Sequence, residues 1–178
     1  MAKIKFSSPL QLARYWDSDP EVIAKKLVQR RKEGPKYSYH TMYGFMRDIL
    51  NFNVDQNKII ECIKKNGGTK YNKRLLIDLV PYFFSYYNSL QCDYCIEIRK
   101  HSYPLWTDMH IPFHAEVAYG CSGKLIIPHN IFWKTNPLSE FQLSIFKTIC
   151  IRTMQQSSDL EAASLDIIDF SRPKRERG

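Results

Sequence analysis

Several common sequence signals are missing from this chain of 178 residues. No run approaches the roughly 18 uninterrupted apolar residues of a membrane-spanning helix, because the longest apolar block, 75–84, contains Asp78 and Pro81. Residues 1–6 lack the long apolar core of a secretion signal. We therefore expect a cytoplasmic protein with no membrane partner.

Catalytic and disulfide signatures are missing too. The sequence contains no glycine-rich phosphate loop, no motif for a Ser or Cys nucleophile and no internal repeat. Its five cysteines are odd in number and irregularly spaced, which argues against a disulfide framework and for reduced thiols. These absences favour a non-catalytic protein without a cofactor.

The charge is unevenly distributed along a globular composition of 44% hydrophobic and 25% charged residues. Residues 1–90 carry 16 Lys and Arg against 8 Asp and Glu, whereas residues 91–178 carry 10 of each. The formal net charge of +8 therefore comes from the first half. Such asymmetry indicates a polyanionic partner at one end of the molecule, although solubility alone would also account for it.

The first half reads as five helices. Their starts are marked by side chains that accept backbone N–H groups, and glycine or proline marks several of their ends. The expected helices cover 9–16, 20–33, 38–50, 55–66 (or from Asn53) and 69–90. The last is apolar nearly all round, which predicts burial on several sides, and Pro81 is expected to kink or split it.

The second half reads mainly as strands. Alternation at 96–98 predicts a first strand that Pro104 ends, and alternation over 109–121 predicts a second. A turn at Ser122-Gly123 leads to a third strand over 125–133. A helix over 138–156 and a fourth strand over 163–170 follow.

This order of elements predicts an α+β fold. We expect an N-terminal helical bundle followed by a small, mainly antiparallel sheet, made of a three-stranded meander, a crossing helix and a fourth strand. The expected division is a basic helical domain over 1–90, a sheet and helix domain over 91–171, and a basic flexible tail over 172–178.

The strongest nucleic-acid signal is a glycine turn between two helices with basic ends. Lysines before the turn, and cations in the helix that follows, could face phosphate together with the dipole of that helix. The candidate residues are Lys64, Lys65, Lys70, Tyr71, Asn72, Lys73 and Arg74, extended by the basic face of 20–33 through Lys25, Arg30 and Arg31. The alternative is a solvated corner with no ligand.

A divalent-metal site is a second hypothesis. His110, His114 and Glu116 alternate along one expected strand, with His129 or His101 as a further ligand from a neighbour. A two-residue turn at Ser122-Gly123 makes paired residue numbers sum to 245 and places Glu116 opposite His129, whereas a longer turn separates them. A row of solvent-facing polar residues is the alternative.

Two shorter motifs carry less information. Cys92 and Cys95 have the spacing of a zinc or redox pair, but they precede a strand, so two small residues at a strand entry are the alternative. Glu97 and Arg99 resemble the acidic and basic pair of metal-dependent nucleases, without an evident companion aspartate.

These observations favour a non-catalytic protein that binds nucleic acid, DNA in particular, through a basic helical face. An adaptor or inhibitor that binds an acidic protein surface is the alternative, and a homodimer fits either function. A metal-dependent hydrolase or nuclease that uses the histidines is the third hypothesis.

Overall fold

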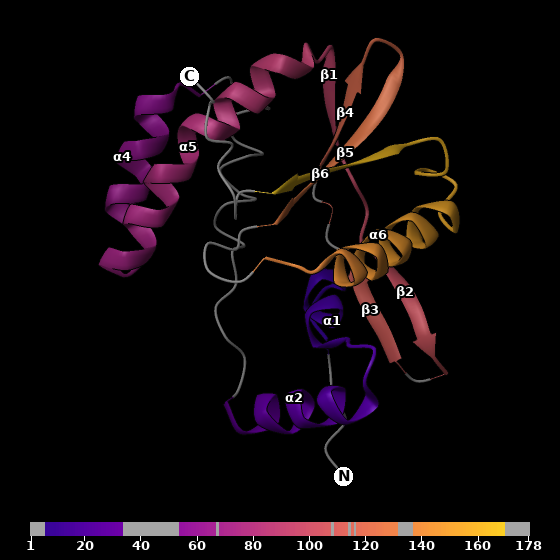
Figure 1. Ribbon diagram of the computed structural model, residues 1–178. Coiled ribbons are helices and arrows are strands. Elements are labelled where there is room, and N and C mark those ends of the chain that lie inside the picture. Colours follow the sequence, from indigo (N-terminus) through magenta and orange to yellow (C-terminus); the bar gives the residue numbers. More distant parts are fainter. Residues whose placement is uncertain are drawn as a thin grey trace. The chain divides into compact units, whose positions relative to one another are not determined.

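The computed structural model describes residues 6–33, 54–66, 68–107, 109–113, 115, 117–131 and 137–169 (Figure 1). For residues 30–33, 71, 72, 106 and 129–131 it describes the backbone alone. The described helices are α1 (Pro9–Tyr15), α2 (Pro20–Glu33), α4 (Gln56–Asn66), α5 (Lys70–Leu90) and α6 (Glu140–Gln155). The strands are β1 (Tyr94–Glu97), β2 (His101–Trp106), β3 (Met109–Phe113), β4 (Val117–Cys121), β5 (Lys124–Ile131) and β6 (Ser164–Asp169).

The fold is α+β, as predicted. One sheet has the strand order β1-β4-β5-β6, and β2 pairs with β3 in a second sheet. The ladders of β1 with β4 and of β4 with β5 are antiparallel, as predicted for the three strands, but the hairpin of β2 and β3 interrupts the expected meander between β1 and β4. The helix predicted over 38–50 lies outside the described residues. None of the described helices is long and apolar enough to cross a membrane.

The predicted helix starts have the expected capping chemistry. Side-chain oxygens of Ser8, Asp19 and Asp55 accept backbone N–H groups of the first turns of α1, α2 and α4, at 3.2, 2.8 and 2.9 Å. Each bond satisfies a donor that has no partner inside its own helix. Of the two candidate starts for α4, the structure therefore uses Asp55.

Helix α5 is one continuous helix with Pro81 inside it. Of the two outcomes expected at this proline, a kink or a split, the split is therefore excluded. The buried side chains of α5 follow the spacing of a single helical stripe, namely Leu76, Leu79, Val80 and Phe83. Leu75, Ile77 and Phe84 beside this stripe are half-buried, whereas Tyr82 is 46% exposed, so one side of the helix faces solvent.

The chain forms two compact units. Unit 1 consists of 1–37, 99–115 and 127–178, and unit 2 of 38–98 and 116–126. Each unit therefore combines segments from both halves of the sequence. The division at residue 90 into a helical domain and a sheet and helix domain stays a prediction.

Unit 1 has a core between α1, α6 and the two-stranded sheet. Phe6, Leu12, Ile111 and Ile149 form its buried cluster. Helix α6 buries the stripe Phe146, Ile149, Cys150, Thr153 and Met154. Phe141, which continues the apolar spacing of this stripe toward the start of the helix, is 48% exposed. The buried stripe thus begins one turn later than the apolar pattern suggested.

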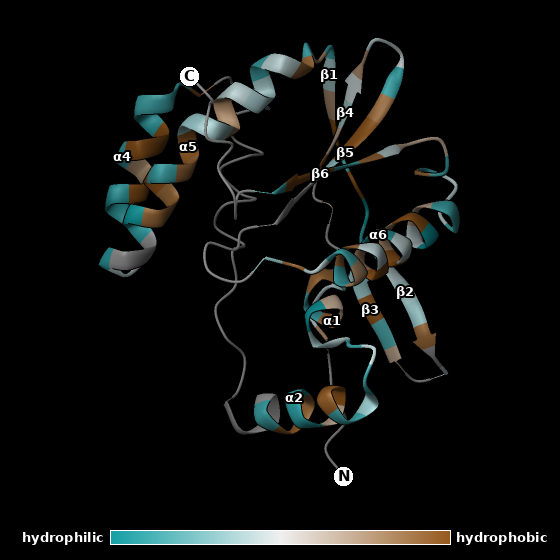
Figure 2. Ribbon diagram, in the orientation of Figure 1, coloured by the Kyte–Doolittle hydropathy of each residue, from teal (hydrophilic) through white to brown (hydrophobic). Residues whose placement is uncertain are grey.

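Unit 2 joins a helical pair to a sheet. Helices α4 and α5 pack together through buried apolar side chains that include Ile59 and Ile63 of α4. Figure 2 shows hydrophobic and hydrophilic residues alternating along α4, as this one-sided burial requires. The C-terminal part of α5 lies against the sheet, where Tyr86 and Leu90 pack on the cluster of Val117, Tyr119 and Cys121.

The single strand predicted over 109–121 is in fact two strands. Residues Met109–Phe113 form β3 and pair with β2, whereas Val117–Cys121 form β4 and pair with β1. The alternating pattern runs through both strands because each strand obeys it. A periodicity of two therefore cannot reveal where the chain changes its partner.

Pro104 does not end a strand, as the sequence suggested, but lies within β2. It pairs with His110, and the ladder shifts between Pro104 and Trp106. Every strand of a two-stranded sheet has one unpaired side, where a missing N–H breaks no ladder bond. The irregular register and the free edge explain why proline is accepted there.

The turn between β4 and β5 has two residues. Ser122 and Gly123 both adopt left-handed backbone angles, with φ of 50° and 77°. Tyr119 pairs with Ile126 and Cys121 with Lys124, so the described pairs sum to 245 as the two-residue turn predicts. Glu116, the expected partner of His129, lies outside the described residues.

Candidate nucleic-acid interface

Five cationic side chains surround the connection between α4 and α5. We call this group the α4–α5 corner, and its members are Lys64, Lys65, Lys70, Lys73 and Arg74. Lys73 is half-buried and the other four are exposed. Because α4 and α5 pack against each other, the C-terminal turn of one and the first turns of the other lie at the same end of the pair.

The C-terminal end of α4 explains three of these cations. Lys73 Nζ donates a hydrogen bond to the backbone carbonyl of Lys64, which is one of the carbonyls that a helix leaves without an internal partner. Lys64 and Lys65 lie in the last turn of α4, where the negative end of the helix dipole favours positive charge. These positions stabilise the helix with or without a ligand.

Lys70 and Arg74 have no such explanation. They lie in the first turns of α5, at the positive end of its dipole, and the first turn contains no acidic residue. Neither forms an ion pair with a carboxylate in the described part of the chain. A cation in the first turn of a helix costs about 0.3–1 kcal/mol, so Lys70 does not stabilise α5, whereas a bound anion at this end would.

Other parts of the predicted basic face are described separately. Lys25 of α2 belongs to unit 1, and its Nζ lies 4.0 Å from Glu21 Oε2 in an exposed pair. The side chains of Arg30, Arg31, Tyr71 and Asn72 are outside the described part of the structure. Their contribution to the interface stays a prediction.

The predicted metal ligands are largely beyond the described residues. His110 is exposed on β3, whereas His114 and Glu116 are not described and His129 is described in its backbone alone. Among the described side chains no group of three His, Cys, Asp or Glu could hold a metal ion. His101, the alternative ligand, is engaged elsewhere.

His101 connects β2 to the turn after α6. Its Nδ1 lies 2.9 Å from Ser157 Oγ, and its Nε2 lies 3.2 Å from Asp159 Oδ2. Ser157 Oγ also donates to the carbonyl of Thr153 at 2.9 Å. Because the hydroxyl proton of Ser157 goes to the carbonyl of Thr153, the hydroxyl oxygen can accept a hydrogen bond from Nδ1–H of His101.

These three residue types resemble a hydrolytic triad, but their arrangement favours a structural role. Ser157 is only 9% exposed, and its hydroxyl proton points to a backbone carbonyl rather than to the imidazole. Sequence reasoning missed this connection because His101 and Ser157 are 56 residues apart and no local pattern links them.

Three cysteines gather where α5 meets the sheet. Cys92 and Cys121 lie with their sulfur atoms 3.1 Å apart, and both Cys92 and Cys95 pack on the cluster around Tyr119. Burial, the hydrogen bond with Cys121 and the nearby Cys95 and Asp93 raise the pKa of Cys92 to about 12. Burial likewise raises the pKa of Cys95 and of Tyr119.

The predicted acidic and basic pair does not form a nuclease-like site in the described structure. Glu97 is the last residue of β1, and Arg99 follows after the strand has ended. Both side chains are exposed, and no described carboxylate completes a group of three around them. The expected companion aspartate therefore remains missing.

Comparisons with known proteins add no assignment. No protein-family model, no curated protein and no solved structure matches this chain.

Proposed function

We propose that this protein binds nucleic acid without catalysing a reaction on it, and that duplex DNA is its ligand. The α4–α5 corner supplies the contacts to phosphate, and Tyr71 and Asn72 in the first turns of α5 are placed in sequence to reach sugar or base edges. The observation that carries this proposal is the position of Lys70 and Arg74. They are exposed cations at the positive end of a helix, without a described carboxylate partner.

Phosphate is the anion that suits this arrangement. The first backbone N–H groups of a helix point outward and attract negative charge, and flanking Lys and Arg side chains add to that attraction. Lys64 and Lys65 extend the same positive surface from the end of α4. The net charge of +8 gives the whole chain a long-range attraction to a polyanion.

The salt dependence of binding tests the proposal. Each phosphate contact releases counterions, so the logarithm of the binding constant falls with the logarithm of salt with a slope of about 0.9 per contact. The double variant Lys70→Ala with Arg74→Ala should bind more weakly and reduce that slope by about 2. Fluorescence anisotropy with a labelled duplex at several salt concentrations measures both quantities.

Lys58→Ala is the matched control. Lys58 is exposed on the first turn of α4, and its Nζ is 3.6 Å from Asp55 Oδ2, so its charge is already paired. Removing it should leave the slope unchanged. A slope near zero for the unmodified protein, or equal losses for Lys58→Ala and the double variant, would exclude the proposed interface.

The alternative partner is an acidic protein surface that uses the same cations. Capture of partners from a cell extract with and without nuclease separates the two ligands, because only nucleic-acid-mediated capture is lost on nuclease treatment. The proposed location is the cytoplasm, in keeping with five cysteines that are all free thiols in the structure.

A further inference from the structure

We infer that Cys92 and Cys121 form a reversible disulfide that fastens the start of β1 to the end of β4. This inference is independent of the proposed function, because the cysteines lie at the opposite end of α5 from Lys70 and Arg74. Both belong to unit 2.

The geometry of the pair carries the inference. The two sulfur atoms are 3.1 Å apart, about 1 Å more than the length of a disulfide bond. Neighbouring backbone contacts hold the two segments together, since the N–H of Asp93 donates to the carbonyl of Gly120 at 2.8 Å. The N–H of Ser122 also donates to Asp93 Oδ2 at 3.1 Å. Oxidation therefore needs only a small movement of two side chains.

Hydrogen peroxide is a sufficient oxidant. The partly exposed Cys92, as its thiolate, attacks one peroxide oxygen; an S–O bond forms, the O–O bond breaks and hydroxide leaves. The sulfur of the buried Cys121 then attacks the sulfenic sulfur of Cys92, the S–S bond forms, and the S–O bond breaks. The oxygen leaves as water with the proton of Cys121. Two thiols are oxidised by two electrons and one peroxide becomes two waters.

The groups around Cys92 set the rate at which its thiolate attacks peroxide. The groups that face it are Cys121 on β4, Cys95 on β1, Asp93, Tyr87 on α5 and Tyr119 on β4. Burial and these neighbours keep the pKa of Cys92 high, so little thiolate is present at neutral pH. Oxidation should therefore be slow at neutral pH and faster in mild alkali.

Peptide mapping of the oxidised full-length chain tests the inference. The protein is treated with peroxide at about pH 8.5, its remaining thiols are blocked, and it is digested with trypsin. Cys92 and Cys95 then lie in the peptide 75–99, and Cys121 lies in the peptide 101–124. A disulfide from Cys92 to Cys121 joins the two peptides, whereas one from Cys92 to Cys95 stays within 75–99. Joined peptides that separate on reduction are the expected result.

Three variants identify the sulfurs. Cys92→Ser should abolish the joined peptides, whereas Cys95→Ser should retain them. Cys62→Ser is the matched control, because Cys62 is a half-buried free thiol on α4 in the same unit. Joined peptides that persist in Cys92→Ser, or a bond confined to 75–99 in the unmodified chain, would overturn the inference. Oxidation of the unmodified chain that leaves the two peptides unlinked would overturn the inference as well. This measurement does not depend on whether any variant folds.

Thermal unfolding gives a second measurement. The cross-link closes a loop of 29 residues in the unfolded chain, and this should raise Tm by about 10 °C over the reduced protein. The rise should vanish in Cys92→Ser and remain in Cys62→Ser. Equal Tm values for reduced and fully cross-linked protein would contradict the fastening of β1 to β4.

Discussion

Gly120 lies under the ring of an exposed tyrosine on the neighbouring strand. It pairs with Tyr94 in the ladder of β1 and β4, and a Cβ atom on Gly120 would lie 2.1 Å from the Tyr94 ring. Tyr94 is 55% exposed, so its ring can move away at the expense of its contact with the sheet. The pair shows that glycine in this strand makes room for a cross-strand aromatic side chain.

Gly120→Ala should therefore lower the free energy of unfolding by about 1 kcal/mol. The same change in a Tyr94→Ala background should be neutral or stabilising, because alanine is normally favoured over glycine in a strand. Gly123→Ala is the control, since its cost comes from a φ of 77° with open space around it and should not depend on Tyr94. Chemical denaturation of the unmodified protein, the three single variants and the two double variants measures the coupling, and additive effects of Gly120→Ala and Tyr94→Ala would refute it.

At the level of residues, sequence reasoning found what depends on near neighbours. The helix starts at residues 9 and 20 were predicted because a cap acts on backbone groups two or three residues away, as Ser8 and Asp19 do. The start of α6 was placed too early, although Ser139 and Gln142 have the spacing of a capping box. The approach of Cys92 to Cys121 could not be predicted, since it depends on which strands pair.

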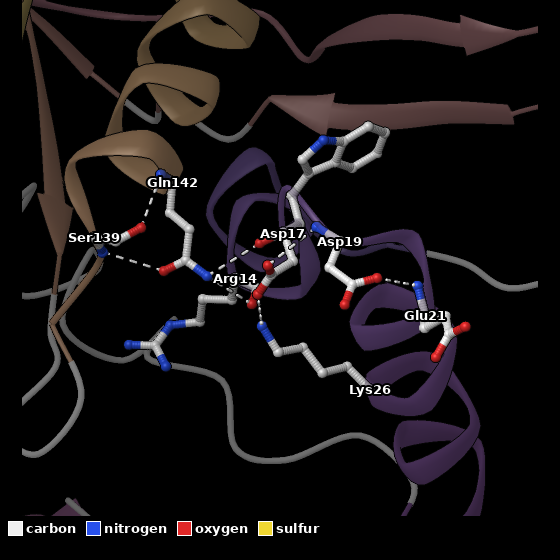
Figure 3. A network of polar contacts seen from close by, with 8 residues as sticks. Arg14, Asp17, Asp19, Glu21, Lys26, Ser139 and Gln142 are labelled. Atoms are coloured by element: carbon white, nitrogen blue, oxygen red, sulfur yellow. Dashed lines mark hydrogen bonds and ion pairs between the residues drawn. The ribbon is translucent and has the colours of Figure 1, made fainter.

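Helices α1 and α6 are connected by one side chain at their ends. Gln142 Oε1 accepts the backbone N–H of Ser139 at 3.2 Å, which completes the capping box of α6 (Figure 3). Its Nε2 also donates to the carbonyls of Arg14 and Trp16, at 3.1 and 3.2 Å. The same amide thus caps the start of one helix and the end of another.

Gln142→Ala should reduce the free energy of unfolding by about 2 kcal/mol, because it removes three hydrogen bonds at two helix ends. Gln155→Ala, at the exposed end of α6, should stay within about 0.5 kcal/mol of the unmodified protein. Urea denaturation followed by circular dichroism compares the two. Similar effects of both changes would mean that the amide of Gln142 does not connect the helices.

Helices and strands were predictable where one strong local pattern defined them. Which strands pair with each other was not predictable in the same way. The turn at Ser122-Gly123 has the shorter of the two lengths that the sequence left open, and a two-residue turn leaves a single pairing of β4 with β5. The division of 109–121 into β3 and β4 was missed, since both strands continue the same alternation. The candidate interface was predictable as a set of charges near a glycine turn, but the bond from Lys73 to Lys64 required the packed helices.

The whole molecule carries a net charge of +8, and self-repulsion among its cations opposes the compact state. Raising the salt concentration from about 0.05 M to about 0.5 M should screen this repulsion and raise the Tm of the free protein by a few degrees. The additional Tm gained on adding duplex DNA should shrink over the same range, because binding weakens. Differential scanning fluorimetry with and without DNA measures both trends, and a DNA-induced shift that grows with salt would contradict the proposed interface.

The hairpin of β2 and β3 lies in the chain between two strands that pair with each other. Strands β1 and β4 can therefore meet only after the segment 98–116 has closed into a loop. Doubling the length of a flexible loop adds only about 0.6 kcal/mol of closure entropy, so a long segment here weakens the pairing little at equilibrium. The long segment does delay the encounter of the two strands. Changing its length should therefore alter the folding rate more than the free energy of unfolding.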